Sequence, residues 1–317
     1  FWTRFVLVSV DVQGGRNARF IFQVHAVGEY MEQQLVDRAE IRESKREGMG
    51  GEFAPLDPGR YSEDWDVLTE RLVLSTYRTP LEGREIKVKM VVIDTGGEEG
   101  VAPKAYAWWR RLRLLGLANR VMLTKGSSLR TKVDWHVKES MVGGVQGEGD
   151  VPLYHLNPNL LKDEVHAGLA RREPGPGYYH FPRVKSPSNP NGWVTQAFFD
   201  EYYAEVRNPD GVWEQVRARN ESLDLSCMIR AACLRLGADK ARLIDRLAGT
   251  AEAAFGHPPC VDRTGGNQAV VTIARDPANQ RCQTPPSVPS AAVVAPASDD
   301  RPFLYYRGGA LPQMYLW

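Results

Sequence analysis

A carboxylate in the middle of an apolar strand is the feature that most constrains how this chain folds. Phe5–Gln13 (FVLVSVDVQ) is β-branched and apolar, yet it contains Asp11 between Val10 and Val12. An ionised carboxylate in such a strand needs a partner, a metal ion or exposure at a sheet end. A Gly-Gly-Arg-Asn turn separates this segment from a second strand-like run, Arg19–Val27. The two runs therefore predict a β-hairpin that carries one acid.

A second acid ends the next strongly apolar segment. Ile86–Asp94 (IKVKMVVID) is typical of a strand covered on both faces, and a Gly-Gly turn follows it closely. Pro103–Leu115 has a helical pattern, and Arg120–Lys125 indicates another short buried strand. This order predicts a parallel βαβ unit beside the hairpin. The carboxyl ends of parallel strands, where Asp94 lies, are where α/β proteins form their sites.

Two further acids, Glu221 and Asp224, lie at the start of a helical segment that runs to Leu236. Their spacing of three residues puts both carboxylates on one face of the helix. Asp11, Asp94 and this pair are distant in sequence, so only the fold brings them together. Structural roles stay open as well, because Asp94 suits a turn and the other two suit a helix N-terminus.

Converging carboxylates predict a particular chemistry. Oxygen ligands of this kind suit Mg²⁺ or Mn²⁺. Two such ions about 3.5–4 Å apart activate a water molecule and stabilise the leaving oxygen in phosphodiester cleavage. In this interpretation Asp11 bridges both ions.

Composition and missing motifs exclude several other classes. The 317 residues include 40 Lys and Arg against 39 Asp and Glu, which argues against a simple nucleic-acid coating protein but not against local DNA contact. No apolar run is long enough to span a membrane. The four cysteines form no CxxC pair, which disfavours a zinc site and indicates a reducing compartment. No Gly-Lys dipeptide occurs, so the chain lacks the phosphate loop of many ATPases.

The chain divides unevenly along its length. Residues 1–256 carry the strand and helix signals and predict one α/β domain. From residue 257 Pro, Ala, Ser, Val and Thr dominate, which predicts a flexible, extended tail over 257–317. Residues 126–152 are polar and Gly-rich and show no clear period. Because Phe1 stands directly before a strand, we expect the chain to be part of a longer protein.

Several segments together resemble one known family. FVLVSVDVQ, MVVIDTGG (Met90–Gly97) and NESLDLSC (Asn220–Cys227) are similar to the nuclease region of the large terminase subunit of tailed bacteriophages, in its lambda-like gpA branch. Further matching segments follow the family's order: VGEYMEQQLVDR (27–38), PLDPGRYSEDWDVL (55–68), AYAWWRR (105–111), VMLTKGSS (121–128) and PGYYHFP (176–182). The resemblance covers about residues 5–237, and YHLNPNLL (154–161) departs from the family's pattern.

The resemblance implies an RNase H-like fold, with a five-stranded mixed sheet of order 3-2-1-4-5 flanked by helices. It also implies a metal-dependent endonuclease that cuts concatemeric viral DNA in the host cytoplasm during genome packaging. Double-stranded DNA, the small terminase subunit and the portal protein are the implied partners. The family's three acids correspond to Asp11, Asp94 and Asp224, with Glu221 as an additional metal ligand candidate. The family's packaging ATPase is missing from this chain, so DNA translocation is not assigned to it.

DNA contacts are expected from local cations rather than from net charge. Arg110 lies on the helix after Asp94, and Lys125 and Arg130 follow the next strand at the same sheet end. Arg110 also fits the solvated face of an amphipathic helix. Two other functions stay open: a different RNase H-like nuclease of the resolvase or integrase type, and a non-catalytic assembly module that docks on portal or small subunit.

Overall fold

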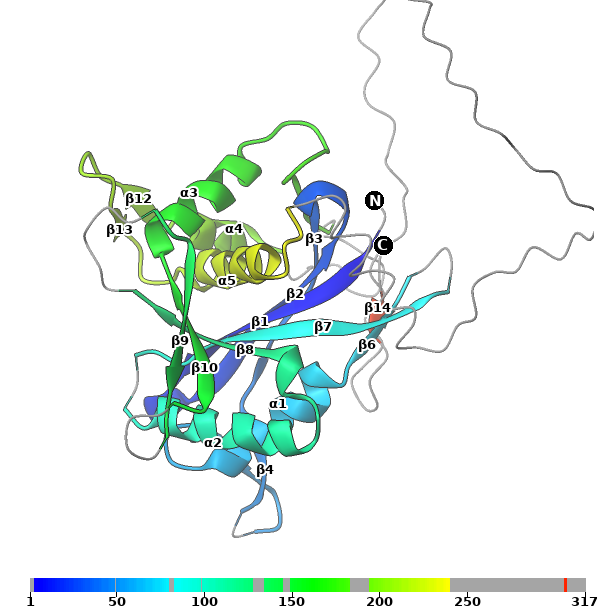
Figure 1. Cartoon of the computed structure of the whole chain (residues 1–317), viewed down its shortest axis with the longest axis vertical. Coiled ribbons are helices and arrows are strands. Elements are labelled where there is room, and N and C mark those ends of the chain that lie inside the picture. Colours follow the sequence, from blue (N-terminus) through cyan, green and yellow to red (C-terminus); the bar gives the residue numbers. More distant parts are fainter. Residues whose placement is uncertain are drawn as a thin grey trace, which may run out of the picture.

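The N-terminal hairpin forms the middle of a mixed β-sheet in a computed structural model of the chain (Figure 1). Strands β1 (Phe5–Gln13) and β2 (Arg19–Val27) pair antiparallel along their full length. β3 (Gln33–Ile41) continues antiparallel beyond β2, whereas β7 (Glu85–Asp94) lies parallel to β1 and β8 (Val121–Gly126) parallel to β7. The predicted hairpin and the parallel unit beside it are confirmed.

The structure describes residues 3–48, 50–79, 83–97, 99–127, 134–144, 149–182, 194–239 and 305–306. Within these residues the main sheet holds ten strands, more than the five expected, along the path β11-β3-β2-β1-β7-β8-β10-β9; off this path β6 pairs with β7, and β14 pairs with β6. Its other strands are β6 (Thr76–Arg78), β9 (Val137–Val142), β10 (Val151–Leu156), β11 (Tyr179–His180) and β14 (Tyr305–Tyr306). Two separate hairpins are β4 (Glu43–Glu47) with β5 (Phe53–Pro55), and β12 (Glu205–Arg207) with β13 (Trp213–Gln215).

Helices cover both faces of the sheet (Figure 1), which confirms the mixed α/β class. One face carries α1 (Asp66–Leu68) and α2 (Val101–Leu114). α1 is continued at its two ends by a 3₁₀ turn, Ser62–Trp65, and a π-helical turn, Thr69–Val73. The other face carries α3 (Pro158–Leu169), α4 (Gln196–Tyr202) and α5 (Glu221–Arg235). Short 3₁₀ turns lie at Gly15–Asn17, Glu29–Met31 and Ala118–Arg120.

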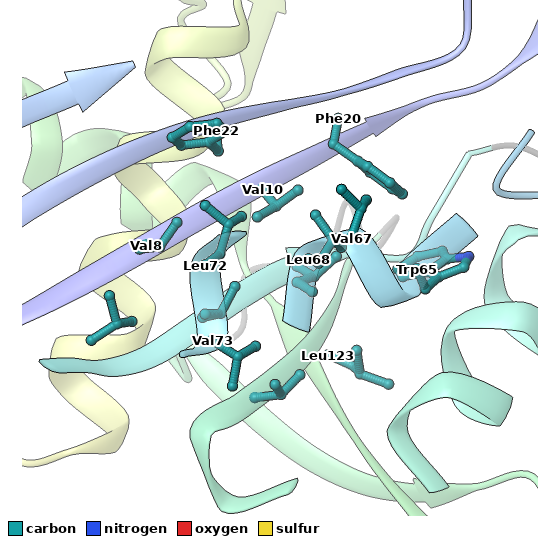
Figure 2. Close-up of a cluster of buried hydrophobic side chains, with 14 of the residues drawn as sticks. Val8, Val10, Phe20, Phe22, Trp65, Val67, Leu68, Leu72, Val73 and Leu123 are labelled. Carbon is teal, nitrogen blue, oxygen red and sulfur yellow. The ribbon is translucent and has the colours of Figure 1, made fainter. Parts of the chain in front are cut away.

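The alternation of side chains along β1 explains why an acid is tolerated there. Val8 and Val10 face the α1–α2 layer and pack in the cluster that contains Trp65 and Leu68 (Figure 2). Leu7 packs in the opposite cluster, under α5. Because side chains alternate between the two faces, Asp11 shares the face of Leu7 and α5 rather than that of the valines.

Residues 126–152, which show no clear period in the sequence, contain strand β9 and the start of β10. β10 pairs parallel with β8 and antiparallel with β9, so this hairpin widens the sheet beyond β8. β9 (VKESMV) has no buried residue and therefore no apolar face that a pattern would detect. Pairing with β10, rather than its own side chains, makes it a strand.

The predicted domain end at residue 256 and nearly all of the predicted tail, 257–317, lie outside the described residues. Tyr305–Tyr306 are the exception, and as β14 they pair antiparallel with β6. The division into domain and tail stays a prediction. Among the described helices none is long and apolar enough to cross a membrane.

Candidate active site

Asp11 reaches the site from the centre of the sheet. Burial raises its pKa to about 6, a hydrogen bond from Gln13 works against this rise, and the charges of Asp94 and Glu221 add to it. The Gln13 Nε2 atom lies 2.5 Å from Asp11 Oδ2. Asp11 is thus an acid whose charge is disfavoured by its surroundings and by its neighbours.

Asp94 is the last residue of β7, and its carboxylate lies close to the backbone of the turn that follows. The Gly96 N–H donates to Asp94 Oδ1 at 3.0 Å. A Cβ atom at Gly96 would stand 3.3 Å from the same oxygen, so a side chain there would crowd the carboxylate. Burial raises the pKa of Asp94, and the nearby charge of Asp224 raises it further.

Asp224 comes from the first turn of α5. Its Oδ2 accepts a hydrogen bond from Asn220 Nδ2 at 2.7 Å, and its Oδ1 lies 3.2 Å from Lys162 Nζ. Burial of the carboxylate raises its pKa to about 6, and the positive charge of Lys162 opposes this rise. The side chain still keeps 42% of its surface accessible, so it lies at an open side of the site.

The three acids line one pocket of about 230 Å³, and they come from β1, β7 and α5. Glu221, the fourth acid predicted for the site, is not among the lining residues. Its Oε2 instead accepts a hydrogen bond from Arg219 Nε at 3.3 Å. The pocket's other lining residues are Thr124, Gly126, Leu156, Pro158, Leu161, Lys162, Cys227 and Met228.

The pocket offers carboxylate oxygens, the ligands that hard divalent cations prefer. Among the described residues no three His, Cys, Asp or Glu side chains form a ready-made metal cluster. The donor set is nevertheless suited to Mg²⁺ or Mn²⁺, because it consists of carboxylates that repel one another and have raised pKa values. Binding of an ion would have to draw these carboxylates together.

A buried ion pair behind Asp224 was not foreseen from the sequence. Lys162 Nζ lies 2.6 Å from both carboxylate oxygens of Glu205, and Glu205 Oε1 also accepts from Asn220 Nδ2 at 2.7 Å. Lys162 and Glu205 are only 7% and 6% exposed. Glu205 therefore binds Lys162 and Asn220, and these two side chains also contact Asp224. The segment around Lys162, LLKDEV, is half charged, so the sequence carries no local signal of this burial.

The predicted DNA contacts lie in different places. Lys125 is exposed near the end of β8. Its positive charge lowers the pKa of Asp94, but this effect is smaller than those of burial, the two backbone hydrogen bonds and the charge of Asp224. Arg110 lies on α2, beneath the opposite face of the sheet, and its Nη2 and Nε lie 2.6 and 2.8 Å from the carboxylate of Asp150. Arg130 lies outside the described residues.

The comparison with known families agrees with this arrangement. Residues 1–243 match the family described as the endonuclease domain of the terminase large subunit gpA. That match spans every described helix, every described strand except β14, and each residue of the acidic pocket. No curated protein and no solved structure matches the chain. The match over three quarters of its length shows that this chain belongs to the gpA family of terminase endonuclease domains.

Proposed function

We propose that this domain is a metal-dependent endonuclease that cuts concatemeric double-stranded viral DNA during genome packaging. The observation that carries the proposal is the convergence of Asp11, Asp94 and Asp224 on one pocket in a terminase endonuclease domain. As a packaging nuclease it would act in the host cytoplasm, together with the small terminase subunit and the portal protein.

We also propose that the fold is RNase H-like. The path β3-β2-β1-β7-β8 supports this, because it reproduces the order 3-2-1-4-5. Strands β3, β2 and β1 pair antiparallel with one another, and β7 and β8 follow β1 in parallel, as a mixed sheet of this type requires. The additional strands lie outside this path, beyond β3 and β8 and beside β7.

The proposed mechanism assigns roles to the chain's own residues. Asp11, Asp94 and Asp224 would hold two Mg²⁺ or Mn²⁺ ions. Such ions polarise a phosphate and lower the pKa of a bound water. Lys162 and Asn220 orient the Asp224 carboxylate, as hydrogen bonds to ligating carboxylates commonly do. Gly126, without a side chain, keeps the rim of the pocket open.

Cleavage of plasmid and linear duplex DNA tests the proposal. The parent protein is expected to nick and linearise plasmid in Mn²⁺ or Mg²⁺ and to be inactive in EDTA. Asp11→Asn, Asp94→Asn and Asp224→Asn should each lower the rate by at least about a hundredfold. Asp210→Asn, an exposed acid in the β12–β13 turn, is the matched control and should cleave normally. Parental cleavage by Asp11→Asn would refute the assignment.

The same assay separates the alternatives. Preferential cleavage of four-way junctions over linear duplex would instead indicate a resolvase-type nuclease. Portal or small-subunit binding without any metal-dependent cleavage would indicate an assembly module.

A further inference from the structure

Arg219 is an exposed cation that two buried carboxylates hold just before the N-terminus of α5. Its Nε donates to Glu221 Oε2 at 3.3 Å, and its Nη2 lies 3.4 Å from Glu201 Oε1. Glu201 and Glu221 are only 6% and 9% exposed, whereas the Arg219 side chain keeps 57% of its surface accessible. The guanidinium is therefore fixed on one side by the protein and open to solvent on the other.

The two carboxylates leave the guanidinium free to bind a further anion. Glu201 is already engaged, because its Oε2 lies 2.7 Å from Arg38 Nη2 and accepts hydrogen bonds from the backbone N–H and the hydroxyl of Ser222 at 3.1 and 2.6 Å. Charge-assisted hydrogen bonds of this kind are usually about 2.7–2.9 Å long. Both contacts of Arg219 are longer than that, so its donors remain available.

Arg219 lies next to the acidic pocket. Asn220, which follows it in the chain, donates a hydrogen bond to the carboxylate of Asp224 in the pocket. Glu221 shares the first turn of α5 with Asp224, at a spacing of three residues that puts both on one helix face. Glu221 is also close enough to Asp11 for its charge to raise the pKa of that acid. The contact with Glu221 therefore places the guanidinium at the rim of the pocket.

The other described cations whose charges reach the pocket acids are less suited to bind a ligand there. Lys162 is buried in its ion pair, and Arg19 keeps only 19% of its side-chain surface accessible. Lys125 is exposed, but it follows Thr124 of the pocket along β8 and so points to the opposite face of the sheet. Arg219 combines exposure with a position on the α5 side, where the pocket lies.

We propose that Arg219 binds a phosphate group of duplex DNA at the rim of the acidic pocket. This inference rests on the proposed endonuclease function and deepens it. The planar guanidinium suits a phosphate, because it can donate two parallel hydrogen bonds to the phosphate oxygens. The acids of the pocket repel a phosphodiester, and an adjacent cation offsets part of that repulsion. Glu201 and Glu221 act as positioning residues for the guanidinium, which gives Glu221 a role other than metal binding.

Salt-dependent binding of a 30-base-pair duplex, measured by fluorescence anisotropy in EDTA, tests the contact. Arg219→Gln should lower the slope of log affinity against log salt concentration by about one and weaken binding about tenfold at low salt. Arg219→Lys keeps the charge, so it should keep the slope but lose part of the affinity. Arg217→Gln is the matched control, because Arg217 is 52% exposed and pairs at 3.1 Å with the exposed Asp200. This control should keep the parental slope.

Cleavage in Mn²⁺ separates a DNA contact from an effect on the pocket. Arg219→Gln should raise the KM for duplex about tenfold, whereas the Mn²⁺ concentration for half-maximal cleavage should stay at the parental value. A change in that Mn²⁺ concentration with a parental salt slope would show that Arg219 acts on the pocket acids through Glu221, and the proposal would be wrong. Equal melting temperatures of Arg219→Gln and Arg217→Gln show that the difference between them reflects DNA contact rather than folding.

The outcomes also separate the contact from the endonuclease itself. If the parent binds and cleaves duplex while Arg219→Gln keeps the parental slope and KM, the contact is wrong and the endonuclease stands. If the parent binds duplex with a slope that depends on Arg219 but cleaves nothing in Mn²⁺, the contact stands and the endonuclease fails. If the parent neither binds nor cleaves duplex DNA, both fail.

Discussion

Lys162 Nζ lies 2.6 Å from each carboxylate oxygen of Glu205, in a pair that is almost completely buried. The two residues are 43 positions apart, on α3 and β12. A buried ion pair contributes little to stability on balance, because desolvation offsets the attraction between the charges. Its position behind Asp224 gives it another use: it sets the orientation of an acid in the pocket.

Glu205→Gln is the first test of this role. The substitution leaves Lys162 buried without a full countercharge, so the free energy of unfolding should fall by about 2–4 kcal/mol. Asp224 would lose its oriented partners, and cleavage should fall about 10–100-fold. Urea unfolding and Mn²⁺ titrations of the cleavage rate measure the two effects.

Lys162 itself offers a matched pair of variants. Lys162→Met should lower cleavage by a similar factor, whereas Lys162→Arg, which keeps the charge, should restore part of it. The Mn²⁺ concentration for half-maximal cleavage should change in Lys162→Met. If Lys162→Met cleaves like the parent at all Mn²⁺ concentrations, the lysine has no positioning role.

Asp11→Asn should stabilise the protein while it abolishes cleavage. The pKa of Asp11 rises from 3.8 to about 6 on folding, so the folded state disfavours the charged form. Such a group contributes stability below pH 3.8, and this stability is lost as the pH rises through about 6. At pH 8 in EDTA, the free energy of unfolding of Asp11→Asn should therefore exceed that of the parent by about 1–3 kcal/mol.

The gain from Asp11→Asn should shrink steadily as the pH falls toward 4, because the parental carboxyl then becomes neutral. Denaturant unfolding at several pH values measures this. Asp210→Asn, on the exposed turn, should show no such trend. Equal stability of Asp11→Asn and parent at pH 8 would show that the acid is not electrostatically strained.

His25 should dominate the loss of stability in mild acid. Its two ring nitrogens lie 3.1 Å from Gln33 Oε1 and Gln23 Oε1, and burial lowers its pKa to about 4. The unfolded chain takes up a proton near pH 6.5 and the folded chain does not, so stability falls as the pH drops from 6.5 toward 4. Between pH 7.5 and pH 5 this amounts to about 2 kcal/mol.

His25→Gln should be less stable at pH 7.5, because it breaks a buried network, but it should lose less stability between pH 7.5 and pH 5. Urea unfolding at both values gives the difference for variant and parent. Parallel pH dependence in the two proteins would contradict the role of His25.

Two adjacent glycines after Asp94 should respond differently to alanine. At Gly96 a Cβ atom would crowd the Asp94 carboxylate, so Gly96→Ala should lower cleavage about tenfold with little loss of stability. Gly97 has a φ of 93° and open space around its Cβ position, so Gly97→Ala should cost about 1–2 kcal/mol of stability without crowding Asp94. Cleavage and thermal unfolding of both variants distinguish crowding from backbone strain.

The sequence by itself determined the elements that carry the site. The apolar runs at β1, β2, β7 and β8 and the helical periods at α2 and α5 are local patterns, and each predicted element is confirmed within a few residues. Asp11, Asp94 and Asp224 could therefore be placed on two strands and one helix before any packing was known. The family could also be recognised, because its motifs occur in order along the chain.

Only the tertiary structure decided which acids meet. Glu221 and Asp224 share the first turn of α5, and their spacing does not say which one faces the pocket. The packing of Leu225 and Ile229 against the sheet sets the rotation of α5, with Asp224 in the pocket and Glu221 beside Arg219. That rotation depends on contacts between distant segments, which no local period contains.

The same reason explains what the sequence did not show. β9 has no buried side chain and becomes a strand only because β10 pairs with it. Lys162 and Glu205 are ordinary charged residues until α3 and β12 pack together. Local patterns determine strands, helices and the acids on them, whereas pairing and packing over long sequence distances create the pocket and the buried ion pair behind it.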